Sequence, residues 1–311
     1  SPRKRKQRSI LVTGISGRFG RRLTRQLHRD VPVVGIDRRP FPDAPKDVAM
    51  YRVNLRSRRS EEAFRQHDIE TVIHLNIMHD PRQGAATMHS FNVMAARKVL
   101  DCCVRYGVQK LIVLSTANLY GSSARSQEYL NEEAPLMGAQ DAATSTLVEL
   151  DMMCTSFMWK HPEVETVVLR PSHIVGKVRN APSNYLRLPR LPKLMGFDPL
   201  MQVIHEDDVV AAILATLLPG ARGVFNVAGP PSVPLSTGLG LLEKPIVEVP
   251  HLLFEPLASR MFKSGLWGFP PNEIRFLQYG STIDDSRIRR ELGFQHKYGL
   301  DEALREFKRY P

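Results

Sequence analysis

Residues 9–20, SILVTGISGRFG, decide the fold of this chain. An apolar run ends at Thr13, and an amphipathic segment begins eight residues later. Between them stand Gly14, Gly17 and Gly20. This order predicts a strand, a tight turn and a helix. The first glycine allows the turn, the second lets the backbone approach a pyrophosphate, and the third lets the helix pack close to the strand. The helix N-terminus then offers N–H groups to the phosphates.

A second apolar run, residues 32–36, ends in Asp37, about 20 residues beyond the glycines, where a dinucleotide-binding unit places a carboxylate on the adenosine ribose hydroxyls. Asp37 favours NAD(H), because its charge would repel a 2′-phosphate. Arg38 and Arg39 follow at once and could attract that phosphate, so NADP(H) remains an alternative cofactor.

Composition indicates a globular chain with a large core. The chain has 311 residues, of which 42% are hydrophobic and 24% charged, enough for one two-lobed unit or two domains. No apolar run approaches the roughly 18–20 residues of a membrane span, and no signal-peptide pattern follows the basic N-terminus. The adjacent Cys102 and Cys103 lie in an apolar helical stretch and are expected to be reduced core residues. A cytoplasmic protein is expected.

The net charge of +11 is concentrated at the N-terminus. Residues 1–8, SPRKRKQR, carry five basic residues and no acid, which leaves about +6 for the rest. We expect a disordered basic tail that folding does not need. Contact with nucleic acid, anionic lipid or an acidic partner is an alternative, although no nucleic-acid-binding motif is present.

Beyond residue 37, strand and helix patterns alternate. Strands are expected at residues 50–53, 71–75, 110–114 and 166–169, and helices at 60–67, 84–106 and 141–159. After residue 170 the expected elements are a helix at 205–218, a strand at 223–228 and helices at 283–294 and 299–310. The pattern predicts an α/β fold, a Rossmann-type doubly wound parallel sheet with a smaller, interleaved C-terminal lobe. The expected domains are 9–176 with returns at about 202–228, and a lobe formed by 177–201 and 229–311.

Several motifs, taken in order over residues 10–294, resemble the extended short-chain dehydrogenase/reductases, the NAD-dependent epimerase/dehydratase superfamily. They are VTGISGRFG, Asp37, the Asn54-Leu55 pair, VIHLNIM, the Asn92 position, LSTANLYG, LRPSHIVG, IHEDDVV and DDSRIRRELGF. Within the superfamily the chain looks closest to a bacterial group described loosely as sugar-nucleotide epimerases.

The resemblance implies a dinucleotide site and a second ligand. The implied cofactor residues are Gly14, Ser16, Gly17, Arg18, Phe19, Gly20, Asp37, Arg38, Asn54, Leu55, Leu75, Asn76, Thr116, Pro171 and His173. The second ligand would be a sugar nucleotide or another anionic small molecule, and a protein partner or a homodimer is possible.

The family's chemistry uses a Ser or Thr, an Asn that supports a water, and a Tyr with a Lys four residues later. Thr116 and Asn92 match the first two. Counted back from Glu149, the Tyr position holds Asp141 and the Lys position Ser145. No shift of register restores the pair, because residues 130–184 contain no Tyr and residues 111–159 no Lys.

This replacement changes the chemistry that the resemblance implies. In the family, the Lys charge lowers the pKa of the Tyr general acid/base. Asp141 would normally be ionised at pH 7 and would protonate an alkoxide poorly. The standard hydride-transfer chemistry is therefore expected to be absent or very weak.

Several other polar groups are candidate site residues. Of the four histidines His74, His79, His89 and His173, the last follows a strand at a loop that in the family runs past the nicotinamide. Residues 205–208, HEDD, could be read as metal ligands, but we favour a helix start with acids at its N-terminus and no metal site. An anion site or plain solvated surface is expected for Arg179, Arg187, Arg190 and Lys193.

Three functions follow from these observations. The leading one is an NAD(H)-binding protein without standard oxidoreductase activity, acting as a cofactor-dependent sensor or scaffold. The second is a sugar-nucleotide epimerase, dehydratase or reductase that uses Asp141, Thr116 and His173 in place of the usual pair. The third is a nucleic-acid-associated member of the family that uses the basic tail.

Overall fold

The computed structural model describes residues 8–79, 82–140, 142–268 and 270–308. By packing, the chain divides into two compact units, each made of three segments. The first unit holds residues up to 115 together with 145–169 and 213–225. The second holds residues 116–144, 170–212 and those from 226 onward.

A seven-stranded parallel sheet forms the first unit, with the strand order β11-β6-β5-β4-β1-β2-β3. Its strands are β1 (Arg8–Thr13), β2 (Val33–Ile36), β3 (Ala49–Tyr51), β4 (Asp68–His74), β5 (Lys110–Leu114), β6 (Glu165–Pro171) and β11 (Gly223–Val227). Its helices are α1 (Arg18–Leu27), α2 (Glu61–Gln66), α3 (Ala85–His89), α4 (Ala95–Arg105) and α5 (Ala142–Lys160), with a π-helical segment at Ser90–Met94 and a 3-10 turn at Arg58–Ser60. The predicted Rossmann-type parallel sheet is confirmed.

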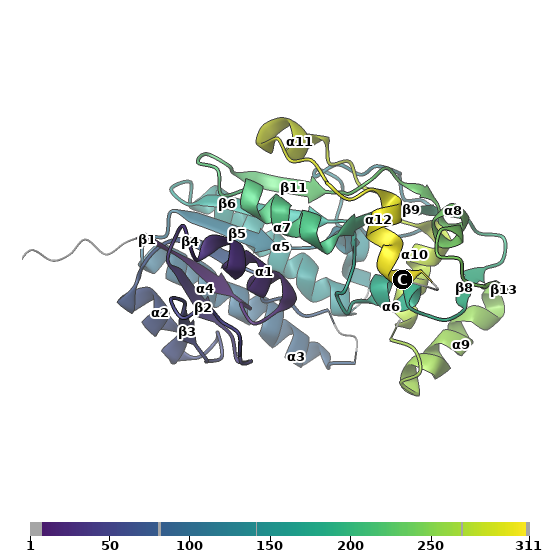
Figure 1. Ribbon diagram of the computed structural model, residues 1–311, viewed down its shortest axis with the longest axis horizontal. Helices are drawn as coiled ribbons and strands as arrows, with labels where there is room; N and C mark the ends of the chain where they lie inside the picture. The colour runs from purple at the N-terminus through teal and green to yellow at the C-terminus, as the bar shows by residue number, and fades with distance from the viewer. Residues whose placement is uncertain (1–7, 80–81, 141, 269, 309–311) are drawn as a thin grey trace, which may run out of the picture. The chain divides into compact units, whose positions relative to one another are not determined.

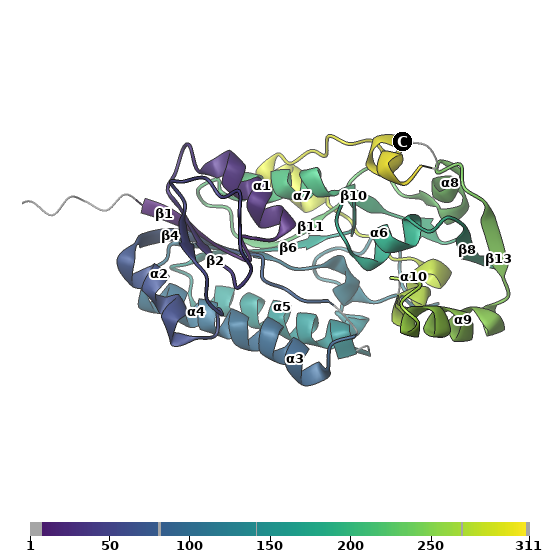
Figure 2. The same cartoon turned by 60° about the horizontal axis from the view of Figure 1, so that its bottom comes forward.

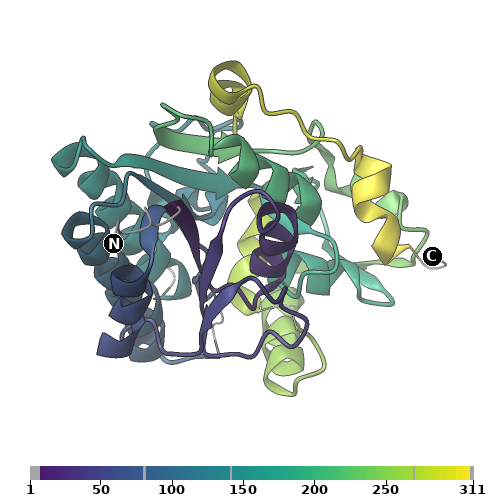
Figure 3. The ribbon, with the colours of Figure 1, turned by 60° about the vertical axis from the view of Figure 1, so that its left-hand side comes forward.

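Helices cover both faces of this sheet, which is why its central strands read as continuous apolar runs. Figure 2 shows α4 and α5 on one face and α1 on the opposite face, and Figure 3 shows the same sheet from one side. The face under α2, α4 and α5 carries one continuous core that includes Leu11, Val99 and Phe157. The three cysteines are buried on this face and form no disulfide.

The parallel register brings the carboxyl ends of the central strands to one edge. Thr13 pairs with Ile36 of β2 on one side and with His74 of β4 on the other. From β1 the chain passes to β2 and β3 on one side, and it later returns to β4 on the other. This reversal beside β1 is the place where doubly wound sheets bind ligands.

The second unit has its own core and is built from short elements. They are β7 (His173–Val175), α6 (Ala181–Leu186), β8 (Leu191–Leu194), β9 (Leu200–Met201), β10 (Val203–His205), α7 (Glu206–Ala215), β12 (Val233–Pro234), α8 (Leu235–Gly240), β13 (Ile246–Val249), α9 (His251–Lys263), α10 (Ile274–Tyr279), α11 (Ser286–Leu292) and α12 (Leu300–Leu304). Short 3-10 helices lie at Ala117–Tyr120, Met137–Gln140, Pro271–Glu273 and Arg305–Phe307. Figure 1 labels most of these elements.

Several of these elements were not predicted from the sequence, namely α6, β8, β9, α8, β13, α9 and α10. Each is short or carries a helix breaker, as α9 does with Pro256 inside it. They are held by a shared core, in which Leu239 of α8, Phe254 of α9 and Leu277 of α10 pack together. Tertiary packing of this kind overrides weak local propensity.

Several sequence-based boundaries change in the structure. Residues 170–176, 202–212 and 226–228, expected in the dinucleotide-binding domain or its returns, belong to the second unit. Residues 116–144, expected in the dinucleotide-binding domain, cluster with the second unit, because Ala117 and Tyr120 share a small core with Ala228 and Ile283. Arg8, expected in the basic tail, is instead the first residue of β1 and lies opposite Asp68 of β4. Residues 1–7 of that tail fall outside the described residues.

Candidate functional site: the glycine turn and its pocket

The turn after β1 is packed so closely that side chains would not fit. Gly14 has a φ of +71°, a left-handed conformation that favours glycine. A Cβ on Gly20 would lie 2.5 Å from both the Cα and the carbonyl oxygen of Ile15. A Cβ on Gly17 would lie 3.1 Å from the carbonyl oxygen of Gly14. The turn therefore brings the start of α1 against the end of β1, as the glycine spacing predicts.

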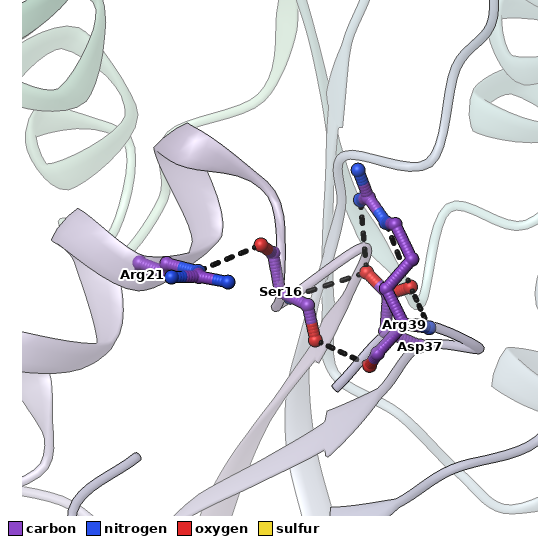
Figure 4. Close-up of polar contacts among 4 residues, drawn as sticks. All are labelled: Ser16, Arg21, Asp37 and Arg39. Carbon is purple, nitrogen blue, oxygen red and sulfur yellow. Dashed lines mark hydrogen bonds and ion pairs between the residues drawn. The ribbon is translucent and has the colours of Figure 1, made fainter. Parts of the chain in front are cut away.

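Asp37, directly after β2, is fully engaged within the protein (Figure 4). Its Oδ1 accepts hydrogen bonds from the backbone N of Arg39 at 2.9 Å and from Arg39 Nε at 3.2 Å. Its Oδ2 accepts from Arg39 Nη2 and from the backbone N of Ser16, both at 3.1 Å. A carboxylate offers about four acceptor positions, and here all four are used.

Ser16 ties the glycine turn to the end of β2 (Figure 4). Its hydroxyl donates to the carbonyl oxygen of Arg39 at 2.9 Å, and its own carbonyl accepts from Arg21 Nε at 2.8 Å. The sequence indicated Ser16 and Asp37 as separate cofactor residues. The structure shows that they form one hydrogen-bonded unit with Arg39. From the sequence, Arg39 was expected only to attract a 2′-phosphate.

A pocket of about 400 Å³ opens at this turn, and all of its lining residues belong to the first unit. The predicted residues that line it are Gly14, Gly17, Arg18, Phe19, Gly20, Asp37, Arg38, Asn54, Leu55, Leu75 and Asn76. The lining residues that were not among the predicted site residues are Ile36, Arg39, Val53, Arg56, Ile77, Met78, Phe91 and Ala95. Six of these eight residues end a predicted strand or follow one within three positions, and this place in the sequence is the signal that could have found them.

The charge of this pocket suits an anion. Four arginines line it, Arg18, Arg38, Arg39 and Arg56, against the single carboxylate of Asp37. That carboxylate is buried, whereas the Arg39 side chain that bonds it is 64% exposed. Because the carboxylate is buried, a ligand that displaces the Arg39 guanidinium must supply hydrogen bonds to Asp37 in its place.

Asn92, in the π-helical segment before α4, holds one wall of the pocket. Its Oδ1 accepts from the backbone N of Met78 at 2.7 Å, and its Nδ2 donates to the carbonyl oxygen of Met78 at 2.8 Å. The same Nδ2 donates to Thr146 Oγ1 of α5 at 2.9 Å. The side chain is fully buried and spans from the loop after β4 to α5. Asn92 therefore ties the loop after β4 to α5, and the family role implied for it, support of a water, stays a prediction.

The other positions implied for the chemistry are divided between the two units. Thr116 begins a segment of the second unit, and its Oγ1 accepts from the backbone N of Asn118 at 3.2 Å. Ser145 is half-buried on α5 and belongs to the first unit. Asp141 lies outside the described residues. Glu149, the residue from which these positions were counted, is exposed, with its Oε1 3.5 Å from His89 Nε2.

The candidate histidines have different environments. His74 is buried at the end of β4, where its Nδ1 lies 2.7 Å from Thr13 Oγ1 and burial lowers its pKa to about 4. His79 is half-buried in the loop after β4. His173 belongs to the second unit, stacks edge-on against Phe276 with ring centroids 5.0 Å apart, and has its pKa lowered to about 4 by burial. Both His74 and His173 are therefore neutral near pH 7. Pro171 lies buried two residues before His173 and also belongs to the second unit.

The acidic residues 206–208 start helix α7 and hold neighbouring segments, as the helix-start interpretation predicts, whereas His205 ends β10. Glu206 is the first residue of α7 and accepts from the backbone N of Lys177 at 3.1 Å. Asp208 accepts from the backbone N of Lys297 at 2.8 Å and of Tyr298 at 3.2 Å. In the described part of the chain, no group of three or more His, Cys, Asp or Glu side chains could hold a metal ion.

None of the four basic residues that the sequence offers for an anion site lines the glycine-turn pocket. Arg187 donates to the carbonyl oxygens of Val178 at 2.9 Å and Gly176 at 2.7 Å. Lys193 is buried beside Glu248, with 3.4 Å between its Nζ and Oε1. The remaining two, Arg179 and Arg190, are exposed. Among the described residues, none of the helices is both long and apolar enough to cross a membrane.

A family model and several known proteins match this chain over most of its length. Residues 10–228 match the model of the NAD dependent epimerase/dehydratase family. An uncharacterized protein of Mycobacterium tuberculosis is 24% identical over 320 residues, which cover 96% of this chain and 83% of that protein. The human short-chain dehydrogenase/reductase family 42E member 1 is 25% identical over 354 residues, covering 99% of this chain and 89% of that protein.

A solved structure shares the fold over nearly the whole chain. MoeE5 in complex with UDP-glucuronic acid and NAD is similar with a TM-score of 0.75 and 21% sequence identity, covering 96% of this chain and 98% of that one. These findings confirm the resemblance to extended short-chain dehydrogenase/reductases that the motifs indicated.

Proposed function

The chain belongs to the NAD dependent epimerase/dehydratase family, and on this premise we propose that it binds NAD(H) in the first unit without performing the family's usual hydride transfer. It acts instead as a cofactor-dependent sensor or scaffold. The observation that carries this proposal is the contrast between an intact glycine-turn pocket and a helix α5 with a serine, Ser145, at the lysine position.

The pocket supports dinucleotide binding on shape and charge. Side chains at Gly17 or Gly20 would meet backbone atoms. Because both residues are glycines, no side chain covers the turn, and a pyrophosphate can approach its backbone. Four arginines line the pocket, and the two phosphates of NAD are anionic. MoeE5, which shares the fold, was solved with NAD, and this supports the same cofactor here. In the family's enzymes, the nicotinamide ring of this cofactor would supply the hydride chemistry.

Asp37 supports NAD(H) over NADP(H) once Arg39 releases it. With the guanidinium gone, Oδ1 and Oδ2 each regain one acceptor position while keeping one backbone N–H donor, from Arg39 and Ser16. Those positions would take the adenosine ribose hydroxyls. Arg39 left in place, or turned toward a 2′-phosphate, would favour NADP(H) instead.

Two features of α5 support the loss of turnover. Ser145 carries no charge that could lower the pKa of a neighbouring acid or contact the nicotinamide ribose as a lysine does. Asn92 is bonded to Met78 and Thr146 instead of standing free to support a proton-relay water. A general acid/base contributes roughly 10²–10⁴-fold to the rate of a typical enzyme, so turnover would fall by at least that factor.

Calorimetry and product analysis test the two halves of this proposal separately. NAD(H) should bind the wild type, and Gly17→Asp should abolish binding, since a carboxylate would enter the pyrophosphate site. In the same preparation, UDP-glucose and UDP-glucuronic acid should give no product by mass spectrometry and no change in nicotinamide absorbance. Turnover that disappears in Asp141→Asn would contradict the proposal and show that a carboxylate has taken over the acid/base role.

A further inference from the structure

The second unit contains a wide cleft of about 1150 Å³, all of whose lining residues belong to that unit. One wall is the loop that follows Ala117–Tyr120, including Ser122 and Arg125. Other lining residues come from α9 and α10, including Glu255 and Arg275. The cleft is large enough for a small-molecule ligand, because such sites usually measure about 300–1,000 Å³.

A narrow apolar cavity adjoins this cleft. Its volume is about 50 Å³, and Glu273 and Phe276 line both the cleft and the cavity. Most of its other walls are aliphatic, with Leu200, Leu235 and Leu277 among them. A space of this size suits a short alkyl branch, and an apolar wall gives no partners to an ordered water.

His173 is a polar residue that lines this mainly apolar cavity. Its ring is held edge-on by Phe276, and its nitrogens make no hydrogen bond with any residue that the structure describes. Burial keeps the imidazole neutral, so one nitrogen can donate a hydrogen bond and the other can accept one. The His173 side chain is half-buried and lines the cavity, so its two nitrogens are open to a polar atom of a ligand that enters there.

The charges around the site do not select an anionic ligand. Among the described lining residues of the cleft, Arg125 and Arg275 are balanced by Glu255 and Glu273. Both arginines are exposed, whereas Glu273 is only 3% exposed and lines the narrow cavity. None of the basic residues at 179–193 that were considered for a diphosphate lines either space. A diphosphate would gain little here and would meet the Glu273 carboxyl group at the cavity.

We propose that this site binds a neutral, mainly apolar alcohol, with an alkyl branch in the narrow cavity and its hydroxyl group between His173 and Glu273. A hydroxyl both donates and accepts, which is the combination that an imidazole and a carboxyl group facing one cavity can satisfy. Glu273 also has an interaction within the protein, so the ligand would be one partner among others. The apolar body of the ligand would lie in the wide cleft.

The first test compares four probes on the wild-type full chain without dinucleotide, by calorimetry. The probes are 2-octanol, 2-octanone, octanoate and UDP-glucose. We expect saturable binding of 2-octanol at one site. The ketone should bind roughly two- to tenfold more weakly, because it lacks the hydroxyl donor. Octanoate should bind more weakly than either, and UDP-glucose should not displace 2-octanol.

Two matched variants then place the site. His173→Leu should weaken 2-octanol binding by roughly two- to tenfold through the lost hydrogen bond. His296→Leu makes the same chemical change in the second unit, but it lines neither space and should leave the affinity unchanged. Thermal melting checks that both variants are folded, and if His173→Leu is not, the probe series on the wild type decides.

Any one of three results would overturn the proposal. They are displacement of 2-octanol by UDP-glucose, tighter binding of octanoate than of 2-octanol, or affinity that His173→Leu leaves unchanged. Binding of NAD(H) is measured separately in the first unit, so a failure of the proposed function would not be mistaken for a failure here.

Discussion

Replacing Arg39 with alanine should separate the affinities for NAD(H) and NADP(H). In the wild type, the Arg39 guanidinium occupies two of the four acceptor positions of Asp37, and NAD(H) must displace it to reach the carboxylate. The Asp37 side chain is only 5% exposed, so displacing the guanidinium costs about as much as losing a charged hydrogen bond, roughly 1.5–3 kcal/mol. Arg39→Ala removes that competition and should tighten NAD(H) binding by roughly tenfold or more.

The same change should act in the opposite direction on NADP(H). A charged hydrogen bond from Arg39 to a 2′-phosphate would be worth about 1.5–3 kcal/mol, so its loss should weaken NADP(H) binding about tenfold or more. Arg25→Ala is the matched control, because Arg25 is an exposed arginine of α1 that pairs with Asp43 and does not line the pocket.

Calorimetric titrations of both dinucleotides with the three proteins, at about 0.15 M salt, measure these changes. An equal loss of both affinities in Arg39→Ala and Arg25→Ala would mean that only the general positive charge matters. Weaker NAD(H) binding in Arg39→Ala alone would show that the guanidinium contacts NAD(H) itself, and the competition argument would be wrong.

Three further changes test the fold around the pocket. Gly20→Ala should lower the free energy of unfolding by roughly 1–3 kcal/mol, because the new Cβ would lie 2.5 Å from backbone atoms. Gly240→Ala, with nothing within 4 Å, should change it by less than about 1 kcal/mol in the same urea titration, and equal effects would refute the packing argument. His74 has a pKa of about 4 when folded and about 6.5 when unfolded, so the unfolded state binds the extra proton as the pH falls. The burial of neutral His74 therefore contributes stability above pH 6.5 that is lost as the pH falls toward 4. About 2 kcal/mol of this contribution is lost by pH 5. His74→Asn should lose less stability than the wild type between pH 7 and pH 5, whereas Thr13→Val should keep the wild-type pH dependence; identical pH profiles for His74→Asn and the wild type would contradict the assignment. Asn92→Ala should cost about 1–3 kcal/mol by leaving buried partners unpaired, and it should weaken NAD(H) binding through the displaced pocket wall. Unchanged NAD(H) affinity in a folded Asn92→Ala protein would confine Asn92 to stability.

The first unit could be predicted from the sequence in most of its features. The glycine turn, the strand that ends at Asp37 and the alternation of strands with helices all depend on local spacing. Spacing of this kind sets which face a side chain takes and where a turn must be tight, so it is visible without a structure. The family resemblance followed from the same motifs, and so did the observation that Ser145 stands at the lysine position.

The second unit shows what local patterns could not provide. Its short elements, such as α8 and α10, have no strong periodicity of their own and are held by a core assembled from distant segments. The place of residues 116–144 in this unit likewise depends on contacts with Ala228 and Ile283, more than 80 positions away in the chain.

The site itself divides in the same way. By itself, the sequence determined that a strand, a glycine turn and an acid are present, because each is a property of neighbouring residues. Only the tertiary structure decided what those groups bind. It saturates Asp37 with Arg39 and Ser16, and it holds Asn92 against Met78 and Thr146. The physical reason is that hydrogen bonds and burial depend on distances in space, whereas a motif records only distances along the chain.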